Sequence, residues 1–120
     1  MKPAFRPGTN IAMKVPMHEF DKTVAFYRDV LGFEQKQASS PDRFDSVVFD
    51  FGGKNLWIDS IAGLSQAEIW LEVETDDTEQ AGAYLADMGC VRRDEVEPLP
   101  PDFRGFWICN PANIIHLIVA

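Results

Sequence analysis

The sequence is poor in cysteine and in basic residues, and it has no long apolar run. Its two cysteines, Cys90 and Cys109, show no CxxC or zinc-binding spacing. We therefore expect no disulfide framework and a reducing, cytoplasmic location. No apolar stretch approaches the roughly 20 residues of a membrane-spanning helix. Nineteen acidic residues against eleven basic ones give a formal charge of −8, which disfavours nucleic acid and membrane surfaces as partners.

Signatures of several enzyme classes are missing as well. The chain has no Gly-rich phosphate loop, no HExxH motif and no nucleophile elbow, so nucleotide hydrolysis, zinc proteolysis and serine esterase chemistry are set aside. What the sequence does have is an ordinary globular composition, with 46% hydrophobic and 12% aromatic residues. Its 120 residues predict a single domain over residues 1–120.

One βαβββ pattern occurs twice, about 58 residues apart. In residues 10–15 and again in 68–73 every second residue is aliphatic, as is typical of a strand with two unlike faces. A segment of helical periodicity follows each strand, over 20–31 and 77–88. Three further strand-like stretches follow each helix: 33–37, 44–51 and 56–61 in the first copy, and 91–96, 103–109 and 114–119 in the second.

Capping residues mark the ends of the predicted helices. Asp21 is the expected N-cap of the first, and Asp77 with Gln80 has capping-box spacing at the start of the second. Gly32 and Gly89 are placed to end them. In the first helix the apolar residues Val24, Tyr27, Val30 and Leu31 lie at helical spacing, which supports the helix prediction.

This organisation predicts an α+β fold of two repeats, about 9–61 and 67–119, whose strands form a curved mixed sheet around a cavity. The alternation predicts one face packed under the helices: Ile11, Met13, Val15, Leu56, Ile58, Ile69, Leu71, Val73, Ile115, Leu117 and Val119. The opposite face would line the cavity: Asn10, Ala12, Lys14, Asn55, Trp57, Asp59, Glu68, Trp70, Glu72, Ile114, His116 and Ile118. A few polar groups among large apolar ones are typical of a small-molecule site.

Two segments resemble the vicinal oxygen chelate superfamily, which includes glyoxalase I, bleomycin-resistance proteins and extradiol dioxygenases. Residues 26–33 (FYRDVLGF) are similar to its helix-to-strand signature, and residues 110–117 (NPANIIHL) are similar to its closing segment. The resemblance covers the chain from about Thr9 to Val119. It implies a glyoxalase-like fold and a homodimer.

The resemblance also identifies four positions where metalloenzymes of that superfamily carry His, Glu, His and Glu. In this chain they fall on Asn10, on Trp57 or Asp59, on Glu68 and on His116. None of them is the usual residue type. A protein without the usual metal is therefore favoured, and the alternative is one divalent ion held by Glu68, His116 and Asp59.

Glu68 and His116 are the candidate catalytic pair, because a carboxylate beside an imidazole can hold a metal ion or move a proton. The alternatives are a structural ion pair between the same two side chains, or a Glu68 that lies at an open rim. The candidate ligand-binding residues are Asn10, Lys14, Trp57, Asp59, Trp70 and Arg104. The tryptophans offer stacking surfaces. Arg104 holds a substrate carboxylate, extends to solvent or pairs with a nearby acid.

Two functions are compatible with these residues. The first is binding of a small cationic or aromatic molecule in the sheet cavity without a catalytic metal, similar to bleomycin-resistance proteins. The alternative is a divalent-metal-dependent lyase, isomerase or dioxygenase, in which the ion binds two adjacent substrate oxygens. The sequence leaves open whether the protein is an enzyme.

Overall fold

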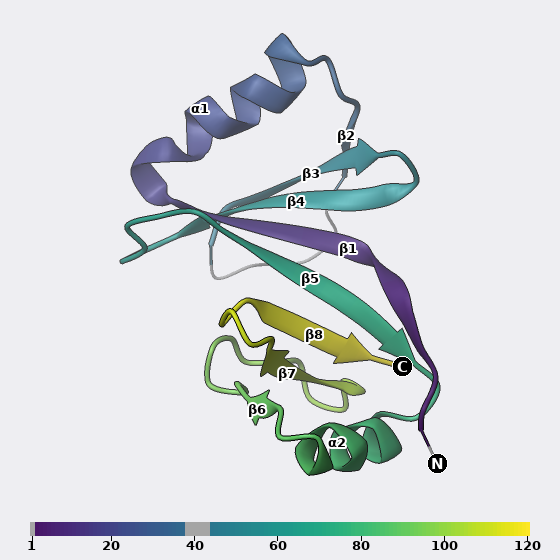
Figure 1. Cartoon of the computed structure of the whole chain (residues 1–120). Coiled ribbons are helices and arrows are strands. Elements are labelled where there is room, and N and C mark those ends of the chain that lie inside the picture. The colour runs from purple at the N-terminus through teal and green to yellow at the C-terminus, as the bar shows by residue number, and fades with distance from the viewer. Residues whose placement is uncertain (1, 38–43) are drawn as a thin grey trace. The chain divides into compact units, whose positions relative to one another are not determined.

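The computed structural model describes residues 2–37 and 44–120, and its elements follow the repeat (Figure 1). The first copy contains β1 (Phe5–Pro16), α1 (Phe20–Ala25), β2 (Gln35–Lys36), β3 (Ser46–Phe51) and β4 (Lys54–Ile61). The second contains β5 (Glu68–Thr75), α2 (Thr78–Asp87), β6 (Val91–Arg92), β7 (Gly105–Cys109) and β8 (Ile115–Val119). No helix within residues 2–37 and 44–120 is long and apolar enough to span a membrane. The predicted α+β class and the two βαβββ repeats are confirmed.

The chain divides into two compact units. The first is Thr9–Ile69, and the second joins the residues up to Gly8 to Trp70–Ala120. The strand order is β2-β3-β4-β1 in the first unit and β5-β8-β7-β6 in the second. β1 and β4 are parallel, as are β5 and β8, whereas the other neighbouring pairs within the units are antiparallel. Each unit therefore contributes a mixed set of strands.

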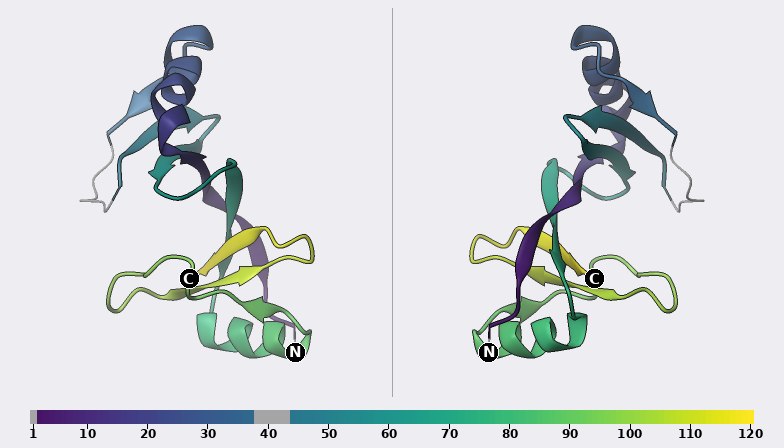
Figure 2. Two further views of the ribbon diagram at one scale, coloured as in Figure 1. Left: turned by 90° about the vertical axis from the view of Figure 1, so that its left-hand side faces the viewer. Right: turned by 90° about the vertical axis from the view of Figure 1, so that its right-hand side faces the viewer.

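α1 covers one face of the first unit's strands (Figures 1 and 2). The buried cluster beneath it consists of Val15, Val24, Phe49, Leu56 and Ile58, with Ile11, Met13, Phe20, Tyr27, Phe33 and Val47 packed against it. The predicted helix-side face of this repeat is thus confirmed, because its aliphatic positions in β1 and β4 all belong to this cluster.

The first helix begins differently from the prediction. A 3₁₀ turn, η1 (Met17–Glu19), leads directly into α1, so that Glu19 stands at the N-cap position. The prediction that Asp21 is the N-cap is therefore wrong. The hydroxyl of Thr23 donates to the carbonyl of Glu19 at 2.7 Å inside this first turn.

The first helix also ends differently, because a π-helical turn, η2 (Phe26–Val30), continues α1. The Leu31 N–H donates to the Phe26 carbonyl, five residues earlier. Val30 and Leu31 are 70% and 46% exposed, whereas Val24 earlier in the helix is buried. Gly32 has a φ of 73° and ends the helix as predicted.

α2 packs on the second unit's strands through a separate cluster. Its Ala81 and Leu85 contact Phe106, Ile108 and Ile118, together with Phe5 and Val73. The Asp77 carboxylate accepts a hydrogen bond from the Gln80 N–H at 3.0 Å, and Gly89 has a φ of 83°. Both predicted ends of this helix are confirmed.

The predicted faces of β8 are reversed. Ile118 lies opposite Val73 of β5 and packs under α2, although it was predicted to line the cavity. His116, two residues earlier, shares that face and lies opposite Leu71. Leu117 instead lies opposite Glu72 and Trp107, on the face away from α2. The predicted faces for these β8 residues are therefore wrong.

The β5 prediction also fails at two positions. Ile69 and Leu71 were predicted to pack under the helices, but they are 39% and 38% exposed. Val73, in contrast, packs against the α2 cluster. Alternation therefore identifies which side chains share a strand face, and the extent of the helix decides which of them are covered.

We expect Asp77→Ala to lower the free energy of unfolding by about 1 kcal/mol, because the Gln80 N–H loses its acceptor at the start of α2. Asp77→Asn keeps an acceptor oxygen and should cost only a few tenths of that amount. Urea denaturation followed by circular dichroism measures both changes. Asp76→Ala is the matched control, since it removes only an exposed ion pair with Arg6. An equal loss in Asp76→Ala and Asp77→Ala would contradict the capping role.

Candidate functional site

The polar residues of the first repeat lie on the sheet face away from α1. The parallel register of β1 and β4 places three pairs opposite each other: Asn10 with Asn55, Ala12 with Trp57, and Lys14 with Asp59. They alternate with the core residues Ile11, Met13 and Val15 along β1. Their predicted grouping on one face is confirmed.

A buried ion pair joins Lys14 and Asp59 on this face. The Lys14 ammonium lies 2.8 Å from one carboxylate oxygen of Asp59, and the two side chains are 4% and 7% exposed. The Ser46 hydroxyl donates to the other carboxylate oxygen. Phe44 lies against the pair, with its ring centroid 5.1 Å from the Lys14 ammonium. β1, β3 and β4 are thereby tied together by charged groups that would be costly to bury unpaired.

A second hydrogen-bonded group surrounds Asn10 on the same face. Its side-chain oxygen accepts from the Trp57 indole N–H at 2.8 Å and from the Asn55 amide at 3.0 Å. The Asn55 oxygen in turn accepts from the Lys36 ammonium at 2.6 Å. Because an amide oxygen offers two lone pairs, both acceptor positions of Asn10 are in use.

The residues at the four positions that the resemblance identifies do not fit a divalent ion in this arrangement. Both carboxylate oxygens of Asp59 and both acceptor positions of Asn10 are engaged by protein donors. His116 lies on the α2 side of β8, where its Nδ1 is 3.0 Å from the Ile114 carbonyl oxygen. Glu68 is half-buried at the start of β5. Within residues 2–37 and 44–120, no group of three or more His, Cys, Asp or Glu side chains is placed to hold a metal.

The remaining sequence candidates lie in the second unit. Trp70 packs edge-on against Trp107, with the ring centroids 5.3 Å apart. Trp107 is 5% exposed and donates its indole N–H to the Glu97 carbonyl, as expected for a core residue. Arg104 is exposed immediately before β7. These positions give Trp70 a packing role and leave the Arg104 side chain at the surface.

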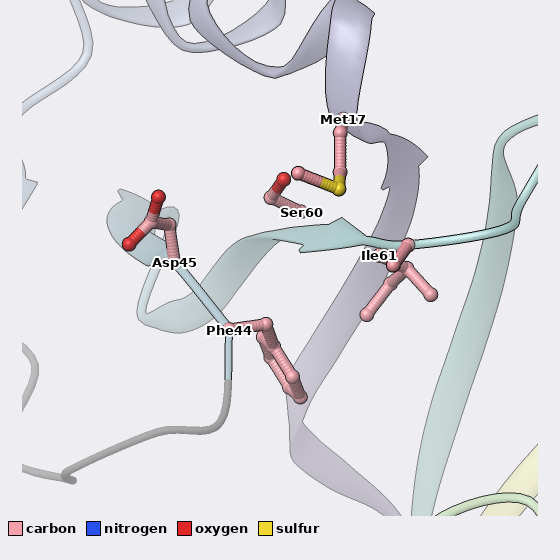
Figure 3. Close-up of a pocket in the computed structure, with 6 residues that line it drawn as sticks. Met17, Phe44, Asp45, Ser60 and Ile61 are labelled. Atoms are coloured by element: carbon pink, nitrogen blue, oxygen red, sulfur yellow. The ribbon is translucent and has the colours of Figure 1, made fainter.

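A pocket of about 480 Å³ lies in the first unit, where β1 and β4 end (Figure 3). Its lining residues are Met17, Phe44, Asp45, Ser60, Ile61 and Ala62. Phe44 and Asp45 come from the segment that leads into β3, whereas Met17 approaches from η1. The Ser60 N–H donates to the Asp45 carbonyl at 2.9 Å and joins two of the walls.

Phe44 connects this pocket to the buried ion pair, since its ring lies against Lys14 and also lines the pocket. None of the lining residues was predicted as part of a site. Met17, Phe44, Asp45 and Ala62 lie outside the strands, and Ser60 and Ile61 lie at the very end of β4. The predicted strands 44–51 and 56–61 include four of these residues, but alternation only assigns a residue to a sheet face, and no motif marks any of them as a pocket wall.

No protein-family model and no curated protein matches the sequence. Solved structures do match it over almost the whole chain. A glyoxalase/bleomycin resistance protein/dioxygenase superfamily member from Vibrio splendidus 12B01 aligns with a TM-score of 0.62 and 16% identity, over 96% of this chain and 97% of that one. The chain has the vicinal oxygen chelate fold. A hypothetical protein from Bacillus halodurans C-125 also aligns, with a TM-score of 0.68 and 8% identity, over 96% of this chain and 93% of that one.

The vicinal oxygen chelate fold of this chain is also similar to part of a larger enzyme. Homoprotocatechuate 2,3-dioxygenase from Arthrobacter globiformis aligns with a TM-score of 0.62 and 16% identity, over 98% of this chain but 36% of the dioxygenase. This chain therefore spans about a third of that enzyme. At this level of identity the comparison shows a shared fold and no shared activity.

We expect Lys14→Met to lower the free energy of unfolding by about 3–5 kcal/mol, because it leaves the buried Asp59 carboxylate without its counter-ion. The double variant Lys14→Met/Asp59→Leu removes both charges and should recover most of that loss. Urea denaturation of the four proteins of this double-mutant cycle measures the coupling.

Arg28→Met is the matched control for this prediction. Arg28 also pairs with a carboxylate, and its hydrogen bond lowers the pKa of Asp29. The side chains of this pair are 49% and 60% exposed, however, so water screens their attraction and its loss should cost much less than loss of the buried pair. If Lys14→Met costs no more than Arg28→Met, the Lys14–Asp59 pair does not stabilise the site.

Proposed function

We propose that this protein binds a small organic molecule in the pocket near the ends of β1 and β4, through its own side chains and without a divalent ion. The observation that carries the proposal is the composition of that pocket. Met17, Phe44 and Ile61 provide apolar walls, while Asp45 and Ser60 add a carboxylate and a hydroxyl. Its volume of about 480 Å³ lies within the range of small-molecule sites.

The lining favours a ligand with an apolar or aromatic body and one amine group. The Phe44 ring and the Met17 thioether are surfaces on which an aromatic group packs well. Asp45 is exposed, so its carboxylate is available to an entering cation. The formal charge of −8 adds a long-range attraction for positively charged molecules.

The buried ion pair supports this function by holding one wall in place. Ser46, whose hydroxyl donates to Asp59, follows directly after Asp45. Phe44 contacts the Lys14 ammonium of the same pair. Asp45 and Phe44, the proposed main contacts of the ligand, are thus held in place before the ligand binds. This reduces the entropic cost of binding.

The proposal makes the protein a binding module instead of a metalloenzyme. The name of the Vibrio splendidus relative covers both resistance proteins and dioxygenases. The hydrogen bonds at Asn10 and Asp59 favour a binding protein of the resistance kind over a dioxygenase, because a metal would have to displace protein donors at both residues. A homodimer, implied by the sequence resemblance, is part of the same proposal.

Benzylamine, which is protonated at neutral pH, is a suitable probe of this pocket, and benzyl alcohol is its neutral counterpart. In nuclear magnetic resonance titrations we expect benzylamine to shift the amide signals of Ser60, Ile61 and Ala62 more strongly than benzyl alcohol does. Asp45→Asn should weaken benzylamine binding by about threefold to tenfold, through loss of a charge-assisted contact.

Asp87→Asn is the control for this titration, because it removes an equally charged, exposed carboxylate from the second unit. Three results would contradict the proposal: shifts that avoid the pocket, equal losses in Asp45→Asn and Asp87→Asn, or binding that requires an added divalent ion.

A further inference from the structure

The side chain of Met17 combines two properties, because it lines the pocket near the ends of β1 and β4 and is also open to solvent. It forms an apolar wall together with Phe44 and Ile61, and it is nevertheless 63% exposed. Figure 3 shows this side chain reaching from η1 toward Ser60. A small reagent in solution therefore has access to a side chain that the proposed ligand would contact.

The backbone at Met17 is held in place independently of its side chain. Pro16 is fully buried at the end of β1, and Phe20 packs against the core cluster of the first unit. The Phe20 N–H also donates to the Met17 carbonyl. A chemical change at the exposed thioether therefore alters a wall of the pocket and leaves the packing on both sides of Met17 intact.

Two other methionines lie within the part of the chain that the structure describes, and their surroundings differ. Met13 packs against the core cluster beneath α1, where a polar thioether derivative would disrupt the core. Met88, at the end of α2, is 64% exposed, but it belongs to the second unit and does not line this pocket. Among these three methionines, high exposure and a place in the pocket coincide only at Met17.

Oxidation by hydrogen peroxide changes the character of such a wall. The methionine sulfur attacks one peroxide oxygen, the O–O bond breaks, and the other oxygen leaves as water after taking up the proton of the first. Sulfur loses two electrons, and the peroxide gains them. The product is a sulfoxide, whose polar S–O group keeps its hydration at the expense of packing against an apolar ligand.

We propose that Met17 is a site of reversible oxidation, through which peroxide lowers the affinity of the pocket for its ligand. This inference rests on the proposed function, because it concerns the same pocket. The thioether form packs against the aromatic body of the ligand, whereas the sulfoxide form holds water at this wall. Reduction by a dithiol, catalysed by methionine sulfoxide reductase, restores the thioether and yields a disulfide and water.

Benzylamine titrations before and after peroxide treatment test this inference. The peroxide dose is kept at a level that leaves the circular dichroism melting curve unchanged, so that core methionine is spared. Peptide mass spectrometry locates the added oxygen, and trypsin separates Met13 from Met17 because it cleaves after Lys14. We expect Met17 and Met88 to be oxidised first, since they are similarly exposed. The oxidised protein should bind benzylamine about threefold to tenfold more weakly, and enzymatic reduction should restore the affinity.

Met17→Leu and Met88→Leu are the matched pair of variants. Leucine keeps an apolar side chain at each position and cannot take up oxygen. The quantity compared is the ratio of the benzylamine dissociation constants after and before peroxide, so that any change in the starting affinity of Met17→Leu cancels. This ratio should be about one in Met17→Leu. In Met88→Leu it should keep the wild-type value.

Three results would overturn the inference and leave the proposed function standing. They are an unchanged affinity in protein whose Met17 is oxidised, a Met17 that resists peroxide while Met88 is oxidised, and an equal loss of affinity in Met17→Leu. The last result would place the sensitive group elsewhere, for instance at the half-buried thiols of Cys90 and Cys109. Untreated protein that binds no benzylamine would instead overturn the proposed function, and this inference with it.

Discussion

The ion pair between Lys14 and Asp59 is the contact on which the first repeat depends. It buries two charges on a sheet face where apolar side chains would otherwise be expected. Each charge is tolerated only while the other is present, and Ser46 completes the hydrogen bonding of the carboxylate. The pair ties three strands together and supports Phe44, which is also a wall of the pocket. The Phe44 side chain therefore links the buried ion pair, which holds the strands together, to the pocket of the proposed function.

Much of the fold could be predicted from the sequence because local signals and the repeat agree. Asp77 caps α2, Gly32 and Gly89 end the helices, and the alternation in β1 and β4 correctly separates the core side chains from Lys14 and Asp59. The reversed faces of β8 could also have been predicted. A shift of 58 positions aligns His116 with Ile58, a core residue, and thus assigns His116 to the helix side.

The site was less predictable, for physical reasons. Alternation shows that Lys14 and Asp59 share a face, but only the register of two strands 45 residues apart makes them partners. The π-helical turn at Phe26–Val30 has no sequence signal of its own. Phe44 and Asp45 line the pocket from the segment before β3, although the sequence pattern predicts that this strand begins at Phe44. Tertiary contacts decide the Lys14–Asp59 pairing, the π-helical turn and the walls of the pocket.

The measurement that tests the central claim most directly is the metal content of the protein, purified without a chelating tag, together with its melting temperature in the presence of Mn²⁺, Fe²⁺, Ni²⁺ or Zn²⁺. If the acceptor oxygens of Asn10 and Asp59 are engaged by protein donors and not by a metal, elemental analysis will find no stoichiometric divalent ion, and the melting temperature will not change when such an ion is added. A near-stoichiometric ion that raises the melting temperature would contradict the account, because an ion that binds the folded protein must stabilise it.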